Sequence, residues 1–316
     1  MKEKEILITG SAGFIGRNIC SEALRLGYKV TGFDLKETKI DGVNSVIGDI
    51  RNKEQIDKVV KNKDFVIHTA AVTSVIEFEK NLFDSYSTNV TGFMNLIDSA
   101  AKSNVSKFLY ASSSAIYLDN FSEETVIDIR KLKNDYSKSK LMNELIAESY
   151  SSLYSMKTIG MRFFNVYGVG ENEKGNYASI ISIFLKNKKE NKPLILYGDG
   201  KQARDFIYVE DLAKIVFMLL DKAENGIYNV GTGRAIEYNY IADLIEKNNK
   251  KYVENPLKTY QYLTKADTKK LFNTIGQYKF KTVEDFIKYS ITNWKMNLDI
   301  LRRQKNAKAL LYHYLE

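Results

Sequence analysis

The sequence contains very little cysteine and proline, and no long apolar run. Cys20 is the single cysteine among 316 residues, which excludes an intrachain disulfide and fits a reducing compartment. Only Pro193 and Pro256 interrupt the chain, so turns must be recognised from Gly, Asn and Asp. No apolar stretch approaches about 18 residues, and the first residues do not resemble a signal peptide. We therefore expect a cytoplasmic protein with no membrane partner.

The composition is otherwise that of a large globular protein. A chain of 316 residues suits one large α/β unit or two closely joined domains, and an apolar share of 44% is ordinary. The formal charge is +8, which is compatible with nucleic-acid binding. However, lysines are spread along the whole chain and no nucleic-acid motif is present. We therefore predict an anionic small-molecule ligand, no nucleic-acid partner and no metal site.

Short apolar runs alternate with amphipathic segments in the first half of the chain. This alternation predicts strands separated by helices, and hence right-handed crossovers in a parallel sheet. The expected strands are 5–9, 29–34, 65–69, 107–112 and 156–163, with helices at 15–26 and 86–102. The second half is less regular, with helices expected at 179–188, 211–222, 238–247 and 283–294 and a strand at 227–230.

The predicted fold class is α/β, a Rossmann doubly wound parallel sheet with a smaller C-terminal α/β substrate lobe. We assign residues 1–164 to the domain built on the parallel sheet and 165–316 to the smaller lobe, which is expected to close over the substrate. Residues 201–233 are expected to return to the first domain. Such sheets bind ligands beyond the carboxyl ends of their strands, so we expect the site there.

A glycine triplet lies between the first expected strand and helix. In Gly10-Ser-Ala-Gly13-Phe-Ile-Gly16, the first glycine permits a tight turn, the second lets a pyrophosphate approach, and the third allows close helix packing. Asp34 ends the second strand, where its carboxylate can accept from ribose hydroxyls and repel a 2′-phosphate. This pattern favours NAD, although Lys36 keeps NADP open. The predicted cofactor-binding residues here are Gly10, Gly13, Phe14, Ile15, Gly16 and Asp34.

Tyr136 and Lys140 lie four residues apart, which places them on one face of a helix. The apolar stripe expected for that helix points almost opposite to this pair, so we expect the pair to face a cleft; the stripe consists of Met142, Leu145, Ile146, Ser149 and Leu153. A nearby ammonium stabilises phenolate and is expected to lower the pKa of Tyr136. The pair therefore predicts a base that takes a proton from a sugar hydroxyl.

These motifs together resemble the extended short-chain dehydrogenase/reductases, a family that handles nucleotide-activated sugars. The resemblance rests on the glycine triplet, the Tyr-x-x-x-Lys pair and Arg162-Phe-Phe-Asn-Val-Tyr-Gly168, and it runs over nearly the whole chain. It implies that Asp49 and Ile50 contact adenine and that Ala70 and Ala71, after His68, lie beside the pyrophosphate. It also makes Asn89 a cofactor-site asparagine.

The resemblance further implies the catalytic groups. The family's catalytic hydroxyl lies four residues before Tyr117, which selects Ser113, with Ser112 and Ser114 as neighbouring alternatives. Ser113 would hydrogen-bond the reacting sugar oxygen, Tyr136 would be the general base or acid, and Lys140 would hold the nicotinamide ribose. Substrate contacts are implied for Ser113, Ser114, Asn165 and Arg204, whose guanidinium fits a diphosphate. A surface ion pair of Arg204 with Asp205 or Glu210 is the alternative.

Two details narrow the branch of the family. Sugar-nucleotide 4,6-dehydratases carry Asp-Glu after the catalytic hydroxyl, where this chain has Ser114-Ala115, so dehydration is not expected. The C-terminal half resembles the ADP-glyceromanno-heptose 6-epimerases around 173–175, 231–235, 260–267 and 280–283. That resemblance makes Lys174 a second base and Tyr260 a substrate contact. Val169-Gly170, Leu118 and Thr259 depart from the pattern, which leaves the base and the sugar open.

We therefore predict NAD-dependent oxidation of a nucleotide-linked heptose or hexose at C4 or a neighbouring carbon. The ketone either leaves, in a dehydrogenase, or is reduced from the other face, in an epimerase. The nucleotide could be ADP, GDP or UDP. The alternatives are ADP-glyceromanno-heptose 6-epimerase itself and, in another class, a non-catalytic dinucleotide sensor. The resemblance also implies a homodimer, or a higher oligomer, built on helices near 86–102 and 137–154.

Overall fold

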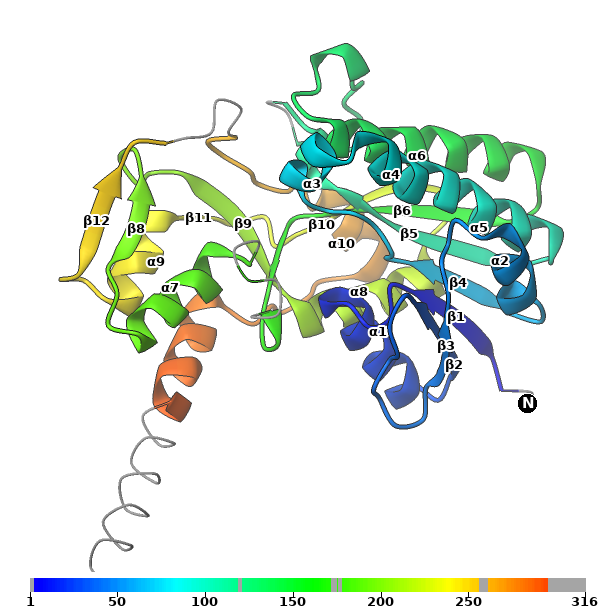
Figure 1. Cartoon of the computed structure of the whole chain (residues 1–316), viewed down its shortest axis with the longest axis horizontal. Helices are drawn as coiled ribbons and strands as arrows, with labels where there is room; N and C mark the ends of the chain where they lie inside the picture. Colours follow the sequence, from blue (N-terminus) through cyan, green and yellow to red (C-terminus); the bar gives the residue numbers. More distant parts are fainter. Residues whose placement is uncertain (1–2, 119–120, 172–174, 176–177, 256–260, 295–316) are drawn as a thin grey trace, which may run out of the picture.

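A seven-stranded parallel sheet forms the larger part of the molecule (Figure 1). The computed structural model describes residues 3–118, 121–171, 175, 178–255 and 261–294. The strand order is β10-β6-β5-β4-β1-β2-β3, and every neighbouring pair is parallel. The strands are β1 (Glu5–Thr9), β2 (Lys29–Asp34), β3 (Asn44–Ile47), β4 (Phe65–His68), β5 (Lys107–Ser113), β6 (Lys157–Phe163) and β10 (Gly226–Val230). The predicted fold class is confirmed.

The strand order reverses between β1 and β4, and it is here that a doubly wound sheet opens a ligand crevice. From β1 the chain builds outward through β2 and β3, then crosses back to β4 on the other side. Glycine turns, strand ends and the first helix therefore converge at this one edge.

Helices cover both faces of this sheet (Figure 1). On one face lie α1 (Phe14–Arg25), α8 (Val209–Lys222) and α10 (Lys269–Ile275). On the other lie α2 (Lys53–Val60), α5 (Gly92–Lys102) and α6 (Asp135–Leu153). Side chains alternate along β1, so Ile6 and Ile8 enter one apolar cluster and Leu7 the other. Cys20 of α1 is fully buried, and this burial raises the pKa of its thiol to about 12.

The connection from β4 to α5 is not the single helix that the sequence predicted. It consists of α3 (Val75–Lys80), α4 (Leu82–Tyr86) and a π-helical turn, Ser87–Thr91, before α5 begins. Such turns are rare and often lie at functional sites. This one carries Asn89, which is buried. A glycine follows the turn because a Cβ at Gly92 would lie 2.6 Å from the Ile50 side chain.

The predicted orientation of α6 was wrong. Leu145 and Leu153, expected to face the core, are 54% and 79% exposed, whereas Lys140 is only 2% exposed. The helix instead packs on the sheet through small and polar residues, namely Ser137, Ser139, Asn143, Glu144 and Ala147. A count of apolar positions misses this face because most of its buried side chains are polar.

The remaining elements form a smaller lobe (Figure 1). Its sheets are β7 (Asn165–Tyr167) with β9 (Ala203–Tyr208) and β11 (Ala235–Glu237), and β8 (Leu194–Tyr197) with β12 (Lys250–Val253). Its helices are α7 (Ile180–Lys189), α9 (Tyr238–Ile245) and a helical stretch at 283–294. Its core is rich in aromatic residues, including Tyr167, Phe184, Phe206, Tyr208 and Phe286.

The segment 201–233 divides between the two parts of the molecule. Its first strand, β9, belongs to the three-stranded sheet of the lobe, whereas α8 packs on α1 and β10 completes the seven-stranded sheet. Further along the chain, α10 also packs against α8 and β10. The chain therefore passes several times between the lobe and the large sheet.

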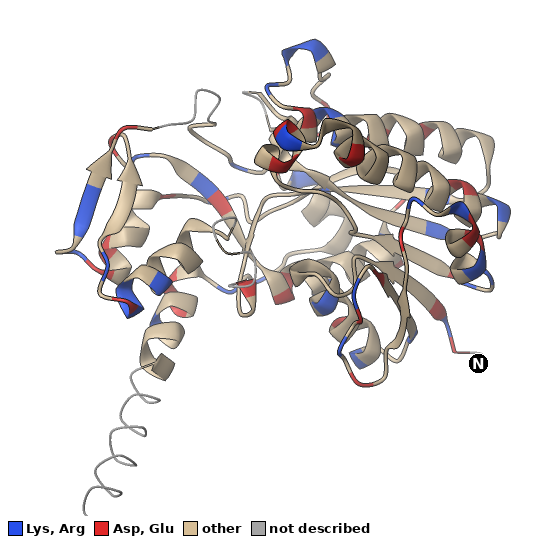
Figure 2. Ribbon diagram, viewed as in Figure 1, with Lys and Arg blue, Asp and Glu red and all other residues tan. Residues whose placement is uncertain are grey.

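Three general properties complete the description. Within the described residues, no helix is long and apolar enough to cross a membrane. Over the same residues, no group of three or more His, Cys, Asp or Glu side chains is arranged to hold a metal ion. Lys and Arg are distributed over both parts of the molecule and are interleaved with Asp and Glu (Figure 2).

Candidate active site

The glycine turn after β1 is shaped so that side chains would not fit. Gly10 has a φ of +73°, and a Cβ there would lie 2.6 Å from the backbone nitrogen of Ala70. A Cβ at Gly16 would lie 2.0 Å from the Gly10 carbonyl oxygen. Gly13 is the N-cap of α1, and no side chain caps the first turn. This arrangement fits a dinucleotide, because the helix N-terminus and its N–H groups can approach a pyrophosphate directly.

Phe14 and Ile15 begin α1 directly after this turn. The Phe14 side chain is buried in the apolar cluster under α1, and Ile15 packs against the same cluster. Packing in this cluster explains why both residues are apolar. It also holds the first turn of α1 in place against the sheet.

Two acidic residues end the neighbouring strands. Asp34, at the end of β2, accepts from the N–H groups of Ala12 and Lys36, each at 3.1 Å. It therefore lies against the glycine turn, as a ribose-binding carboxylate would. Asp49 follows β3 and is held by Arg51, which lowers the pKa of its carboxyl. Ile50 is buried in the core, so its backbone rather than its side chain is the group available to a ligand.

The loop after β4 is fixed by the π-helical turn. Ala70 and Ala71 lie half-buried in this loop, and Ala70 is next to Gly10. The Asn89 amide accepts from the N–H of Val72 at 2.8 Å and donates to the Val72 carbonyl at 2.9 Å. It also donates to Ser139 of α6 at 3.1 Å. Asn89 thus positions the loop rather than presenting its side chain to a ligand.

The predicted catalytic residues meet where β5 ends and α6 begins. Ser113 is the last residue of β5, and its hydroxyl lies close enough to the Tyr136 phenol to lower the pKa of that phenol. The Lys140 ammonium lies 5.9 Å from the centre of the Tyr136 ring and donates to the Ala111 carbonyl at 2.9 Å. The three side chains therefore form one cluster. Asn134 caps α6 by accepting from the Ser137 N–H, which fixes the helix start.

The expected effect of Lys140 on Tyr136 was wrong. Burial raises the pKa of Tyr136, and only the Ser113 hydroxyl opposes this rise. Burial also lowers the pKa of Lys140 to about 8, against the attraction of Glu144. Both shifts have one cause, since partial removal from water disfavours phenolate and ammonium alike.

The three adjacent serines have different surroundings. Ser112 donates to Glu144 at 2.5 Å and is buried, so its hydroxyl is committed to the protein. Ser113 is half-buried beside Tyr136, and its hydroxyl accepts from the Ala115 N–H at 3.1 Å. Ser114 is buried and begins a single 3₁₀ turn, Ser114–Ile116. Of the three, Ser113 has the position that a catalytic hydroxyl requires.

A buried ion pair behind this cluster was missed from the sequence. Arg162 of β6 donates to both carboxylate oxygens of Glu144, at 3.0 and 2.7 Å. It also donates to the Tyr117 hydroxyl at 2.8 Å, and that hydroxyl donates to Asn229 of β10 at 2.7 Å. The available signal was an arginine inside an otherwise apolar strand, together with an acid one helical turn after Lys140.

A cavity of roughly 180 Å³ lies between the start of α6 and the lobe. Lys133 and Arg204 are its cations, and no acidic residue of the described chain lines it. Its walls are Ala115, Tyr117, Leu118, Lys133, Asn134, Arg204 and Gln261. The cavity joins the catalytic strand end to the lobe and has the charge that an anionic substrate needs.

The predicted substrate residues of the lobe bond to the protein itself. Arg204 is buried and donates to the carbonyls of Ala203, Gln261 and Tyr262. Asn165 donates to the Asp205 carbonyl at 3.3 Å and to the Thr264 hydroxyl at 3.2 Å. The alternative reading of Arg204 as a surface residue was wrong. The Asp205 carboxylate accepts from the 232–233 turn and from Ala266. Lys174 and Tyr260, the predicted second base and substrate contact, lie outside the described residues.

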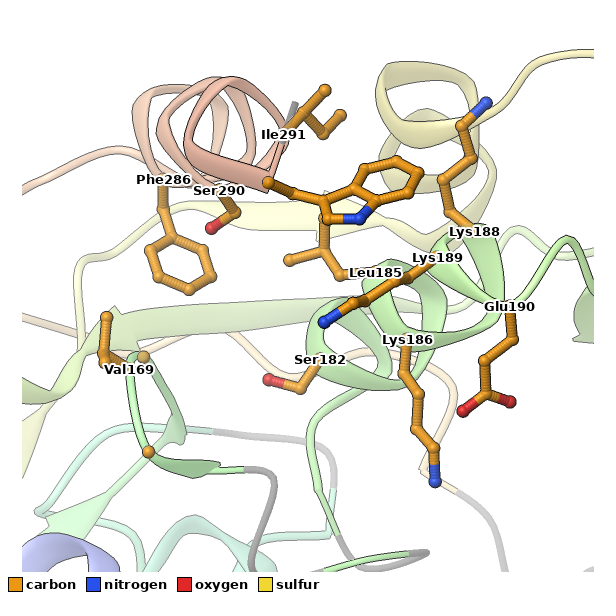
Figure 3. A pocket seen from close by; sticks show the side chains of 13 residues that line it. Val169, Ser182, Leu185, Lys186, Lys188, Lys189, Glu190, Phe286, Ser290 and Ile291 are labelled. Carbon is orange, nitrogen blue, oxygen red and sulfur yellow. The ribbon is translucent and has the colours of Figure 1, made fainter. Parts of the chain in front are cut away.

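A larger hollow of the lobe lies elsewhere (Figure 3). It has a volume of roughly 600 Å³ and lies between residues 168–170, α7 and the helical stretch 283–294. Lys186, Lys188 and Lys189 contribute to its rim, and Phe286 and Ile291 to its apolar wall. None of the residues predicted to bind cofactor or substrate lines it. Size therefore does not identify the candidate site in this molecule.

Comparison with known proteins gives one family and several relatives. The model of the "NAD dependent epimerase/dehydratase family" matches residues 6–231. A Methanocaldococcus jannaschii protein named as a candidate UDP-glucose 4-epimerase is 33% identical over 252 residues, covering 76% of this chain and 81% of its own.

Solved structures agree with this assignment. One is UDP-N-acetylglucosamine 4-epimerase from Methanobrevibacter ruminantium in complex with UDP-N-acetylmuramic acid. It has a TM-score of 0.82 at 26% identity, covering 93% of this chain and all of the other. Another is UDP-glucose 4-epimerase from Thermus thermophilus in complex with NAD. It has a TM-score of 0.79 at 26% identity, covering 90% of this chain and 98% of the other.

Proposed function

Because the chain belongs to the NAD dependent epimerase/dehydratase family, we propose that it is an NAD-dependent 4-epimerase of a UDP-linked hexose. The observation that carries the proposal is the cluster of Ser113, Tyr136 and Lys140 at the end of β5. Ala115 and Asn134, close in sequence to Ser113 and Tyr136, line the cationic cavity. The named relatives at 33% and 26% identity supply the substrate class.

The chain's own residues account for the proton transfers of such a reaction. Tyr136 accepts the proton of the C4 hydroxyl when the alcohol is oxidised and returns it when the ketone is reduced. Ser113 donates a hydrogen bond to the reacting oxygen in both directions. NAD supplies the acceptor and donor of the hydride. Because Tyr136 serves both steps, this reaction requires no second base.

The cofactor would be held by the glycine turn, with Asp34 on the adenosine ribose. The Asp34 carboxylate already bonds to the turn, and an added 2′-phosphate would face its negative charge. NAD is therefore proposed over NADP. The expected result is at least about tenfold tighter binding of NADH than of NADPH, measured by fluorescence titration. Equal affinities for NADH and NADPH would contradict the placement of Asp34 on the adenosine ribose.

Arg204 is proposed to hold the diphosphate at the cavity wall. Its guanidinium donates to three backbone carbonyls, which fixes the plane of the group. A planar cation held in this way faces the cavity in a defined orientation, which suits phosphate oxygens. Asn165, one strand away in the same small sheet, is proposed as a neighbouring substrate contact.

The resemblance to heptose 6-epimerases leaves a second substrate class to test. It rests on 173–175, 231–235, 260–267 and 280–283, and the two residues to which it gives roles, Lys174 and Tyr260, lie outside the described residues. The decisive experiment incubates the protein with UDP-glucose, UDP-galactose, UDP-N-acetylglucosamine and ADP-heptose in D₂O and follows the products by NMR. The expected result is interconversion of a UDP-hexose pair without deuterium at C4, because hydride returns to the carbon from which it came.

Other outcomes are equally definite. Net accumulation of NADH with a keto or acid product would show a dehydrogenase. If only ADP-heptose were converted, the protein would be a 6-epimerase that acts at the exocyclic carbon of the heptose. NADH binding without turnover of any nucleotide sugar would favour a non-catalytic sensor and would contradict the proposal.

We also propose that the protein is a homodimer through α5 and α6. Large apolar side chains are exposed on these two helices, namely Met94, Leu145, Leu153 and Tyr154 just beyond α6. Burying such side chains against a second copy removes apolar area from water. Leu145→Glu with Leu153→Glu is expected to give a monomer by light scattering. Unchanged mass would contradict this interface.

A further inference from the structure

The Glu144–Arg162 ion pair is largely buried and joins three elements of the candidate site. The exposed fractions of the two side chains are 6% and 4%. Glu144 comes from α6, Arg162 from β6, and Ser112 of β5 adds a third bond to the carboxylate. Burying two charges is costly, and such a pair often contributes little net stability. Its position beside the catalytic residues therefore requires another explanation.

Glu144 lies one helical turn after Lys140. Residues at i and i+4 are neighbours on a helix surface, so the carboxylate and the ammonium share one buried face of α6. The Lys140 ammonium has one hydrogen bond to the described chain, to the Ala111 carbonyl. A neutral carbonyl does not replace the water that a buried ammonium has lost. Glu144 is the acidic group that attracts this ammonium.

Arg162 holds the Glu144 carboxylate in place. Its guanidinium lies on the sheet side of the carboxylate and stacks on the Tyr117 ring at 4.7 Å. Two bonds to Arg162 and one to Ser112 fix the carboxylate, so it cannot turn away from α6. The Glu144 carboxylate is thus held in one position and is not mobile.

We propose that Glu144 is a positioning residue for the reaction proposed above: clamped by Arg162 and Ser112, its carboxylate keeps the buried Lys140 ammonium protonated and directed toward the end of β5. The inference depends on the proposed function for its catalytic meaning. It extends that function by assigning Glu144 as the negative charge that keeps Lys140 protonated. Lys140 in turn lies beside Tyr136.

The groups around Lys140 leave this role to Glu144. His68 of β4 is buried and neutral, and the charge of Lys140 is one reason that its pKa falls. Tyr110 of β5 is also buried, and burial raises its pKa well above the usual value. Burial also raises the pKa of Tyr136 on α6. Burial lowers the pKa of Lys140 to about 8, so losing one nearby negative charge would move its protonation into the physiological range.

The test measures the protonation of Lys140 directly. Protein labelled with ¹⁵N-lysine is titrated by NMR, and Lys140 is the signal that disappears in Lys140→Met. In the wild type the midpoint is expected at about 8. In Glu144→Gln it is expected about 1 pH unit lower, because the amide keeps the shape but not the charge. The alkaline limb of the kcat profile should move by the same amount.

A matched control separates charge from packing. Tyr117→Phe removes the hydroxyl that bonds to Arg162 and Asn229 but leaves the Glu144–Arg162 bonds. Its Lys140 midpoint should stay within about 0.2 units of the wild type, even if substrate affinity falls. Should Glu144→Gln not fold, Glu144→Met with Arg162→Met removes both charges at similar volume, an exchange that buried pairs often tolerate.

The outcomes are distinguishable. An unchanged or raised midpoint in the folded Glu144 variant overturns the inference, as does an equal shift in Tyr117→Phe. A wild type that titrates as expected but turns over no nucleotide sugar would contradict the proposed function while leaving the link between Glu144 and Lys140 in place.

Discussion

The two parts of the molecule build their halves of the candidate site in different ways. At the large sheet, the cofactor cradle consists mainly of backbone, with Gly10, Gly13 and Gly16 leaving space where side chains would collide. In the lobe, the candidate contacts are long side chains, Arg204 and Asn165, that the protein's own carbonyls and hydroxyls hold in place. The first half excludes side chains, and the second orients them.

The difference explains how one scaffold serves many substrates. A backbone cradle recognises what all dinucleotides share, the pyrophosphate and ribose, and tolerates few substitutions. Side chains fixed by residues distant in sequence can be exchanged one at a time without altering the fold. Mutations in the sheet should therefore affect catalysis, cofactor binding and folding, whereas mutations in the lobe should affect substrate affinity.

The largest expected effect is on chemistry at the sheet. Tyr136→Phe should lower kcat by about 10²–10⁴-fold, because the proton acceptor is lost, while NADH affinity stays within about twofold. Tyr150→Phe on the same helix, whose phenol bonds to Asp98, is the control and should be near normal. Initial rates and NADH titration measure both. Near-normal turnover by Tyr136→Phe would remove its role as base.

Next in size is the steric limit of the cradle. Gly16→Ala should destabilise the protein by about 3 kcal/mol, because the new methyl group would meet the Gly10 carbonyl at 2.0 Å. Gly27→Ala, just beyond the other end of α1, meets nothing within 4 Å and should cost about 1 kcal/mol through its φ of +81°. Urea unfolding compares the two. Equal losses would show that crowding at Gly16 is unimportant.

A mutation in the lobe should separate affinity from chemistry. Arg204→Met is expected to raise KM for the UDP-sugar by about 10–100-fold, with kcat changed less than about threefold, because a charge-assisted contact is lost. Arg234→Met removes an exposed ion pair with Glu284 and should have little effect. Steady-state kinetics and melting temperatures are the measurements. If kcat fell as much as KM rose, Arg204 would contribute to catalysis, as the sheet residues do, and not only to substrate affinity.

The smallest expected effect is on acid stability. The pKa of His68 falls from 6.5 to about 3 on burial, so the folded protein binds fewer protons than the unfolded chain below 6.5. Its stabilising contribution is therefore complete above pH 6.5 and is lost as pH falls toward 3. At pH 5 the loss is about 2 kcal/mol. His68→Asn should show a correspondingly smaller drop between pH 7 and pH 5 in urea unfolding; an identical drop would contradict the assignment.

The sequence was most informative where one physical cause dominates. Fully buried parallel strands such as 5–9 and 107–112 are continuous apolar runs, and the glycine spacing reflects a steric requirement, so both were predictable. The lobe strands β8, β9, β11 and β12 were missed. β11 has three residues and β8 and β12 four each, and only a neighbouring strand defines such short elements. Their register depends on contacts that no local pattern encodes.

The sequence-based predictions were wrong where polar residues are buried and apolar residues are exposed. In α6 the buried face carries Lys140 and Glu144, and the exposed face carries Leu145, the reverse of an ordinary amphipathic helix. The lysine was recognised, but the acid and its partner Arg162 were not, because a buried pair is complete only when both strands and the helix are assembled. The same assembly explains the error over Tyr136, whose surroundings exclude water as well as bringing a cation near.

The sealed thiol of Cys20 makes the protein well suited to single-molecule fluorescence. Deep burial and a pKa of about 12 leave that sulfur unreactive toward maleimide dyes under native conditions. Cysteines introduced at exposed sites, one on the large sheet's helices and one on the lobe, would carry a donor and an acceptor without any background labelling. The distance between the two parts could then be followed in real time as nucleotides are added.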